Sequence, residues 1–81
     1  MKEIFVITTV FFNNLNEFLS IMTQVREDET SALETMSNFL NDNYESHSDV
    51  ENNPKEGEYL YKAYGYGKYS KALVTITRNY I

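Results

Sequence analysis

The run from Lys2 to Phe12 constrains the fold most strongly, because it is apolar on both of its sides. β-branched and aromatic residues dominate the run, and they favour extended backbone. Side chains of a strand alternate between two faces. One face would carry Ile4, Val6, Thr8, Val10 and Phe12, and the other Phe5, Ile7, Thr9 and Phe11. Such a strand lies at the centre of a sheet, or buries one face in the core and the other in an interface. The second arrangement indicates a homodimer.

The length and composition predict one small folded domain. The chain has 81 residues, of which 42% are apolar and 15% aromatic, so it holds a single core and is not of the disordered class. It has no cysteine, which fits a reducing compartment. The N-terminal segment lacks the pattern of a signal peptide, and no apolar run reaches the length of a membrane span. We therefore expect a cytoplasmic protein.

Residues 15–26 fit two different structures. As a helix capped by Asn14, they would form one apolar stripe that includes Leu15, Phe18 and Met22. As a strand after an Asn-rich turn, they show the alternation that is typical of a half-buried strand. The alternating sets are Leu19, Ile21, Thr23 and Val25 against Ser20, Met22, Gln24 and Arg26. The β-branched residues favour the strand, which we prefer.

A helix is predicted next in the chain. The acidic residues 27–29 complement the positive end of a helix dipole, and Ser31 followed by Glu34 matches a capping box. We predict a helix from Ala32 to Asn43. Its core-facing stripe would contain Leu33, Met36, Phe39 and Leu40.

The remainder of the chain completes an α+β fold. Residues 45–57 are polar, contain the single proline, and predict a mobile loop. Residues 58–66 and 71–80 alternate as strands do, and the two glycines between them predict a turn. The expected order is ββαββ, a four-stranded, mainly antiparallel sheet with one helix packed on a face. The alternative is βααββ, in which residues 15–26 are helical.

The residue types do not favour catalysis. A hydrolytic triad needs a nucleophile, a base and an orienting group, and the single histidine, His47, lies in the predicted loop. One histidine among scattered carboxylates matches no metal-ligand spacing. A chain this short also has little material for enclosing a pocket. We predict a protein that is not an enzyme and uses neither a metal nor a cofactor.

The charge distribution selects the C-terminal quarter as the candidate site. Residues 59–81 hold four cations, no acid and six of the seven tyrosines, whereas all twelve acids precede them. Tyrosines are enriched at protein interfaces, and aromatic residues beside cations also bind RNA. The predicted partner-binding residues are Tyr61, Lys62, Tyr64, Tyr66, Lys68, Tyr69 and Lys71.

The order of segments resembles small early proteins of tailed phages. An N-terminal strand, an Asn-containing turn, a second strand and an acidic run that opens a helix occupy residues 2–43. This half is similar in layout to the Dmd-type antitoxins of T-even phages. The resemblance implies a small phage protein that binds and neutralises a host RNase toxin. The segment after residue 43 departs from that layout.

These observations lead to one principal function and two alternatives. We expect a phage-encoded inhibitor or antitoxin that acts in the host cytoplasm as a homodimer and binds a host toxin or defence protein. The first alternative is a small RNA-binding protein that uses the tyrosine- and lysine-rich C-terminal sheet. The second is a nucleic-acid mimic that uses the acidic residues of the first half.

Overall fold

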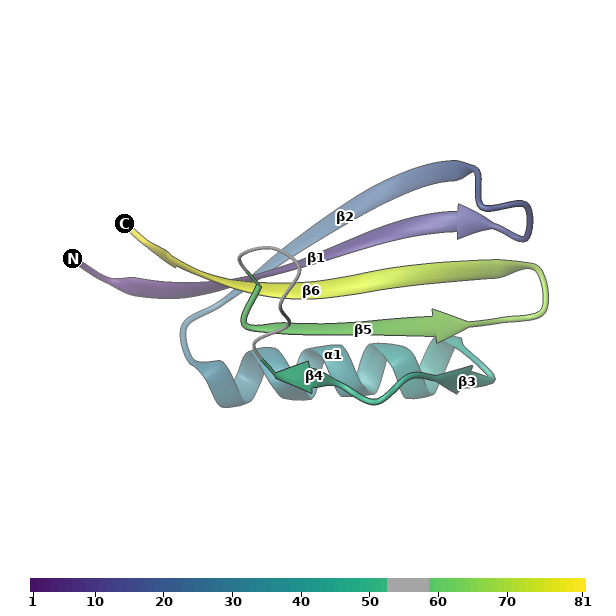
Figure 1. The fold of residues 1–81 in the computed structure, drawn as a ribbon. Coiled ribbons are helices and arrows are strands. Elements are labelled where there is room, and N and C mark those ends of the chain that lie inside the picture. The colour runs from purple at the N-terminus through teal and green to yellow at the C-terminus, as the bar shows by residue number, and fades with distance from the viewer. Residues whose placement is uncertain (53–58) are drawn as a thin grey trace.

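The computed structural model describes residues 1–52 and 59–81 (Figure 1). Within these ranges the chain forms one helix and six strands: β1 (Glu3–Asn13), β2 (Phe18–Arg26), α1 (Glu29–Asn43), β3 (Ser46–His47), β4 (Glu51–Asn52), β5 (Tyr61–Tyr66) and β6 (Ser70–Tyr80). All of these strands join one sheet, and their pairings are antiparallel. The strand order is β2-β1-β6-β5-β3, and β4 also pairs with β5.

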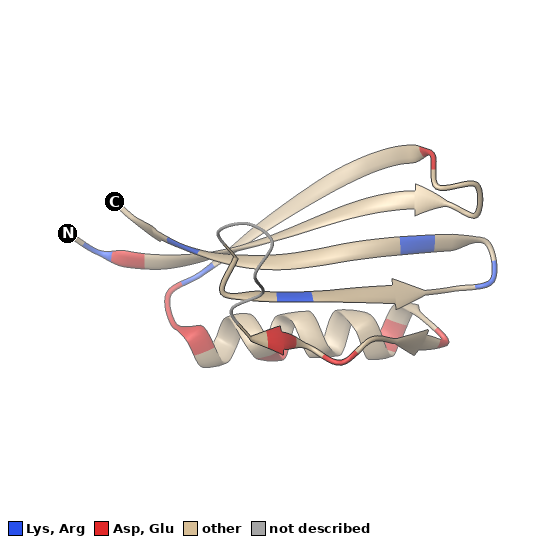
Figure 2. Cartoon of the chain, in the orientation of Figure 1, with Lys and Arg blue, Asp and Glu red and all other residues tan. Residues whose placement is uncertain are grey.

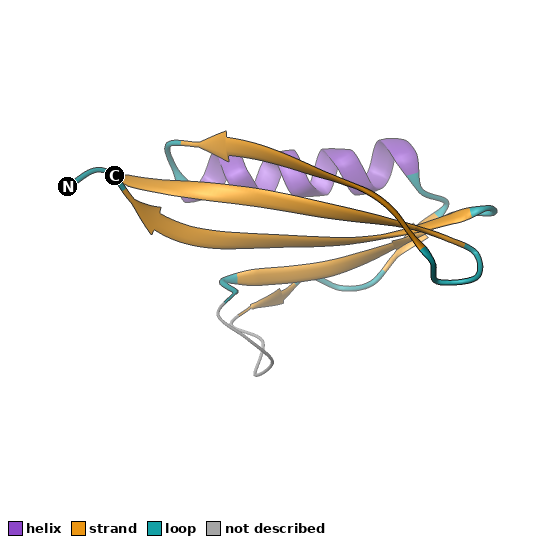
Figure 3. Ribbon diagram, turned by 90° about the horizontal axis from the view of Figure 1, so that it is seen from above, coloured by secondary structure: helices purple, strands orange, loops and turns teal. Residues whose placement is uncertain are grey.

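The first strand lies inside the sheet, between β2 and β6. Its register with β6 sets Ile7 opposite Ile76 and Thr9 opposite Val74, and all four side chains are buried. The helix runs along only one side of the sheet (Figure 3). One of the two apolar faces of β1 therefore belongs to the core, and the other faces away from α1.

The helix begins earlier than its sequence pattern predicts. Asp28, not Ser31, is the N-cap residue, and its carboxylate accepts a hydrogen bond of 2.7 Å from the backbone N–H of Ser31. An aspartate at this position satisfies a free backbone donor and complements the helix dipole. The buried helix residues are Ala32, Met36 and Leu40, which recur every fourth residue and so form one stripe.

The expected four-stranded ββαββ layout is wrong, because the described residues form a six-stranded sheet. The strand alternative for residues 15–26 is the correct one, so the βααββ order is wrong too. The two additional strands, β3 and β4, lie within the predicted loop 45–57 and pair with β5. Each is two residues long, which is too short to produce an alternating pattern. Residues 53–57 of that loop lie outside the described residues.

The polypeptide after α1 packs closely on β5 at Gly65. A Cβ atom at this position would lie 2.7 Å from Cδ2 of Tyr44 and 3.0 Å from Cδ2 of Leu40. The absent side chain lets the Tyr44 ring approach the strand closely, where the ring also contacts Phe39. Burial raises the pKa of the Tyr44 phenol, against a smaller lowering by its hydrogen bond with Ser70.

We predict that Gly65→Ala destabilises the protein. The added methyl group overlaps the Tyr44 ring, and overpacking of this kind typically costs about 1–3 kcal/mol. Urea unfolding followed by circular dichroism measures the free energy of unfolding. In a Tyr44→Ala background the same substitution should cost less, because the ring is gone. An equal cost in both backgrounds would contradict the packing described here.

Candidate partner-binding face

The side of the sheet that faces away from α1 is here named the open face. Strand alternation assigns residues to it, since the buried residues Phe5, Ile7 and Thr9 of β1 face the helix. The strand pairings align the open-face residues in four rows across the sheet. The rows are Val25–Val6–Thr77, Thr23–Thr8–Thr75–Lys62, Ile21–Val10–Leu73–Tyr64 and Phe18–Phe12–Lys71–Tyr66.

The β2 side of the open face exposes large apolar side chains. Phe18, Ile21 and Val25 are 62%, 59% and 52% exposed. The neighbouring open-face residues Val10 and Phe12 of β1 are half-buried. Phe18, Ile21, Val10 and Phe12 form one apolar surface over the edge and second strands, because residues opposite one another across paired strands are neighbours. The row of Thr23 and Thr8 separates this surface from Val25.

Aromatic rings and lysines occupy the other side of the open face. The rings of Tyr64 and Tyr66 are stacked, with centroids 6.3 Å apart and an interplanar angle of 18°. Lys62 Nζ lies 5.3 Å from the Tyr64 centroid, and Lys71 Nζ lies 5.8 Å from the Phe12 centroid. The lysines therefore lie over ring faces, where the negative charge of the π system attracts a cation.

The structure brings together most of the predicted partner-binding residues. Lys62, Tyr64, Tyr66 and Lys71 share the open face. Lys68 and Tyr69 lie next to them in the exposed turn between β5 and β6, where Lys68 Nζ is 5.3 Å from the Tyr69 centroid. Tyr61 does not belong to the set, because the strand alternation turns its side chain to the opposite side of the sheet.

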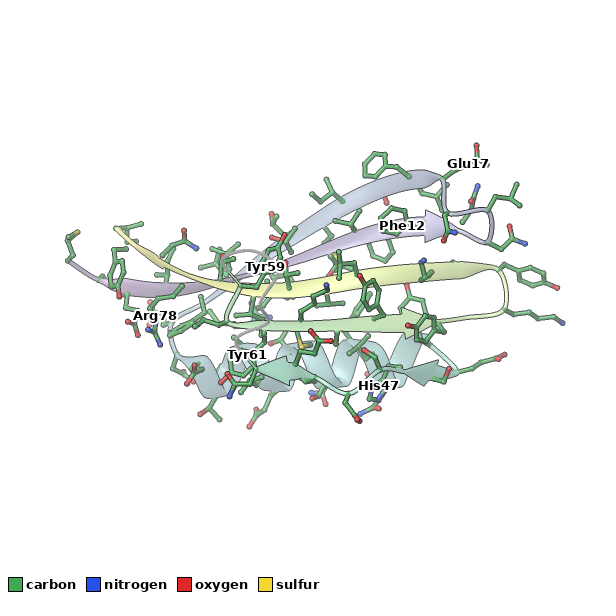
Figure 4. The ribbon with its side chains drawn as sticks, in the orientation of Figure 1. Phe12, Glu17, His47, Tyr59, Tyr61 and Arg78 are labelled. Atoms are coloured by element: carbon green, nitrogen blue, oxygen red, sulfur yellow. The ribbon has the colours of Figure 1, made fainter. Side chains whose placement is uncertain are left out.

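Tyr61 is part of the packing beneath the sheet (Figure 4). It is half-buried and packs against the hydrophobic core. Burial raises the pKa of the Tyr61 phenol, and so do a hydrogen bond with Glu29 and the charge of that carboxylate, whereas Arg78 lowers it. Arg78 in turn forms ion pairs with Glu3, at 3.3 Å, and with Glu29, at 4.0 Å. The Tyr61 side chain thus links β5 to the start of α1.

The apolar residues of β2 are the part of the site that the sequence analysis missed. Half-buried alternation predicts that the apolar set of a strand faces the core. In β2 the opposite holds, since the polar set lies on the helix side: Arg26 donates a hydrogen bond of 3.1 Å to Thr35 of α1 and another of 3.1 Å to Gln24. The apolar second face of β1 was the available signal, because a sheet covered on one side only leaves such a face exposed.

Charge is divided between the two sides of the fold as well. Figure 2 shows acidic residues along α1 and the β3–β4 segment, and lysines on β5, on β6 and in their turn. The part of the open face on β5 and β6, which carries the tyrosines and lysines, is here named its basic end.

Residues 1–52 and 59–81 contain no detected pocket and no cluster of three or more potential metal ligands. Their one helix is too short and too polar to cross a membrane.

No family model matches the sequence, and no curated protein or solved structure matches the chain.

We predict that Tyr61 and Tyr66 differ in their contributions to stability. Tyr61→Ala removes a ring that packs on the core and should lower the free energy of unfolding by about 2–3 kcal/mol, somewhat less than for a fully buried aromatic residue. Tyr66 is 44% exposed, so Tyr66→Ala should change it by less than about 1 kcal/mol. Urea unfolding of both variants tests this, and equal losses would contradict the assignment of the two faces.

Proposed function

We propose that this protein is a non-enzymatic interaction protein that binds another protein through its open face. The observation that carries the proposal is the group of large apolar residues, Phe18, Ile21 and Val25, exposed by more than half on a face that α1 does not cover. Contiguous exposed apolar surface is typical of interaction sites. Short, branched side chains on a regular sheet also lose little conformational freedom when a partner covers them.

The basic end of the open face defines the chemistry of the partner. The stacked rings of Tyr64 and Tyr66 offer a large, rigid contact area. Lys71 lies on the same end of the face, and Lys68 lies in the adjoining turn. A surface that complements this face has an apolar patch with carboxylates on one flank, since opposite charges favour encounter and fix orientation.

The resemblance of residues 2–43 to Dmd-type antitoxins supports a narrower form of the proposal. The partner is then a bacterial toxin or defence protein, and this protein inhibits it in the host cytoplasm. Inhibition requires only that the open face cover a surface that the toxin needs for its own activity. A binding face without catalytic groups is sufficient for that role.

We predict that Tyr66→Ala and Lys68→Ala each weaken partner binding by at least about tenfold, a loss typical of interface residues that contribute strongly. Tagged wild-type protein and both variants are used to capture partners from bacterial lysate, and the captured proteins are quantified by mass spectrometry. A partner specific to the open face is enriched by wild type and depleted in both variants.

The matched control is Tyr80→Ala. Tyr80 is exposed to a similar degree, 56%, but it lies near the chain end, opposite Glu3 of β1, and its side chain faces the other side of the sheet. It should retain full capture. A partner that all three variants capture equally would remove the tyrosine- and lysine-rich end of the open face from the binding site, whereas loss in all three would indicate an unspecific effect of the substitutions.

RNA binding is the second candidate, and the stacked tyrosines beside lysines are the observation that favours it. Nucleic-acid bases stack on aromatic side chains, while lysines neutralise phosphates. Salt separates the two functions: binding to single-stranded nucleic acid weakens with a slope of about −0.7 in log K per neutralised phosphate. Capture that disappears after nuclease treatment and at raised salt would replace the protein partner by RNA.

A further inference from the structure

The strand β2 forms an unpaired edge of the sheet, since it is hydrogen-bonded to β1 alone. In Figure 1 it lies along the upper border, with nothing beyond it in the described chain. The opposite edge is different, because it consists of the two-residue strands β3 and β4. An edge strand presents a row of unpaired N–H and C=O groups that can pair with another strand.

The hydrogen bonds at the chain ends identify which groups of β2 point outward. Lys2 and Ile81 exchange two backbone hydrogen bonds, of 2.8 and 2.9 Å, so even-numbered residues of β1 bond to β6. Odd-numbered residues of β1 must then bond to β2, because successive residues of a strand direct these groups to opposite sides. The hydrogen bond from the Asn13 N–H to the Glu17 carbonyl agrees with this assignment.

The register between β1 and β2 then divides the backbone groups of β2. The odd-numbered residues Phe5, Ile7, Thr9 and Phe11 oppose Arg26, Gln24, Met22 and Ser20, so these four residues of β2 bond to β1. In the regular part of β2, the N–H and C=O groups that point to the free edge belong to Ile21, Thr23 and Val25. All three residues are also exposed, and the Val25 carbonyl already accepts a hydrogen bond of 2.8 Å from Arg26 Nη1.

This edge lacks the features that usually prevent strand pairing. Natural proteins protect edge strands with lysines, prolines, bulges or very short length. Between Phe18 and Val25 the strand has no charged residue and no proline, and its register irregularity lies at the Phe18 end. The segment from Ser20 to Val25 is thus a regular and uncharged edge.

We propose that β2 pairs with β2 of a second copy of this chain, antiparallel and about a two-fold axis at Met22. In this register Ile21 of one copy opposes Thr23 of the other, so the outward N–H and C=O groups of both residues are paired. A shift by one pair in either direction would instead pair Val25, whose carbonyl already bonds to Arg26, or Leu19, which lies at the register shift. The two sheets form one continuous sheet with both open faces on the same side.

The charge distribution along β2 is compatible with a second copy at this edge. The chain carries a net charge of −5, but β2 has no acid from Phe18 to Val25, so pairing two copies brings no like charges together within this segment. At its ends Arg26 of one copy opposes Phe18 of the other, and Glu17 opposes Glu27, whose charge is already paired with Lys2 at 2.5 Å.

The first test uses a single engineered cysteine. The chain has none of its own, so Met22→Cys introduces a unique thiol on the two-fold axis. The two positions form a non-hydrogen-bonded pair, in which Cα atoms are about 4.5 Å apart, within the range of a disulfide. Mild oxidation should convert most of the variant to a covalent dimer. Ser37→Cys, on the exposed side of α1, is the control and should stay largely monomeric.

The second test removes the edge without disturbing the fold. Thr23→Pro deletes an outward N–H that makes no bond within the monomer, a position where a strand tolerates proline. Thr23→Lys places a charge beside the axis and keeps the backbone intact. Sedimentation equilibrium over a hundredfold concentration range should show a dimer for wild type and Thr23→Ala. It should show at least a tenfold weaker association for Thr23→Pro and Thr23→Lys.

Two results would overturn the proposal. Wild-type protein that remains monomeric at the highest concentration excludes self-association through this edge. A dimer that persists in Thr23→Lys, with no disulfide in Met22→Cys, places the contact elsewhere, for example between two open faces. The binding assays with Tyr66→Ala and Lys68→Ala test the partner-binding proposal separately. Tyr66 lies on β5 and Lys68 in the turn between β5 and β6, so neither is at the β2 edge.

Discussion

The packing of one helix on one side of the sheet is the constraint on which the rest of the structure depends. Ala32, Met36 and Leu40 of α1 are fully buried against β1, β5 and β6, where Phe5, Ile7, Ala63, Val74 and Ile76 complete the same cluster. A chain of 81 residues holds one core of this kind. Because the described residues form one helix, α1 covers only one side of the sheet.

This asymmetry explains several features together. β1 is apolar on both faces, yet only its odd-numbered residues are buried in the core. β2 turns its polar residues toward the helix, where Arg26 finds Thr35 as a hydrogen-bond partner, and leaves its apolar residues in solvent. Exposed apolar surface on a folded protein is unfavourable by roughly 25 cal/mol per Å² relative to burial. A partner that covers the open face would recover this free energy on binding. The exposed apolar residues are therefore consistent with the proposed function.

The open face and the free edge of β2 are parts of one surface. Ile21 and Val25 direct their side chains to the open face and their backbone groups to the edge, so the two proposals use different chemical groups of the same residues. Pairing two copies through the backbone leaves the side chains available to a partner. It also doubles the apolar area on one side of the assembly, with the tyrosine and lysine groups at its two outer ends.

Much of the local structure could be predicted from the sequence, because it depends on neighbouring residues. Period-two alternation identified the long strands, and the acidic run with an apolar stripe at helical spacing identified α1 to within three residues of its start. Lys62, Tyr64, Tyr66 and Lys71 were selected because tyrosines and cations cluster in residues 59–81, and that selection wrongly included Tyr61, which alternation separates from them. The short strands β3 and β4 could not be found, because two residues have no period and their pairing with β5 is a long-range interaction.

The sequence by itself determined that the strands have two faces and which residues share each face. Only the tertiary structure decided which face the helix covers, and therefore that Ile21 is exposed while Gln24 lies on the helix side. The physical reason is that alternation is symmetric: it separates two sets of side chains but does not say which is inside. That choice depends on the strand register and on the side from which α1 packs, and it also removed Tyr61 from the binding surface.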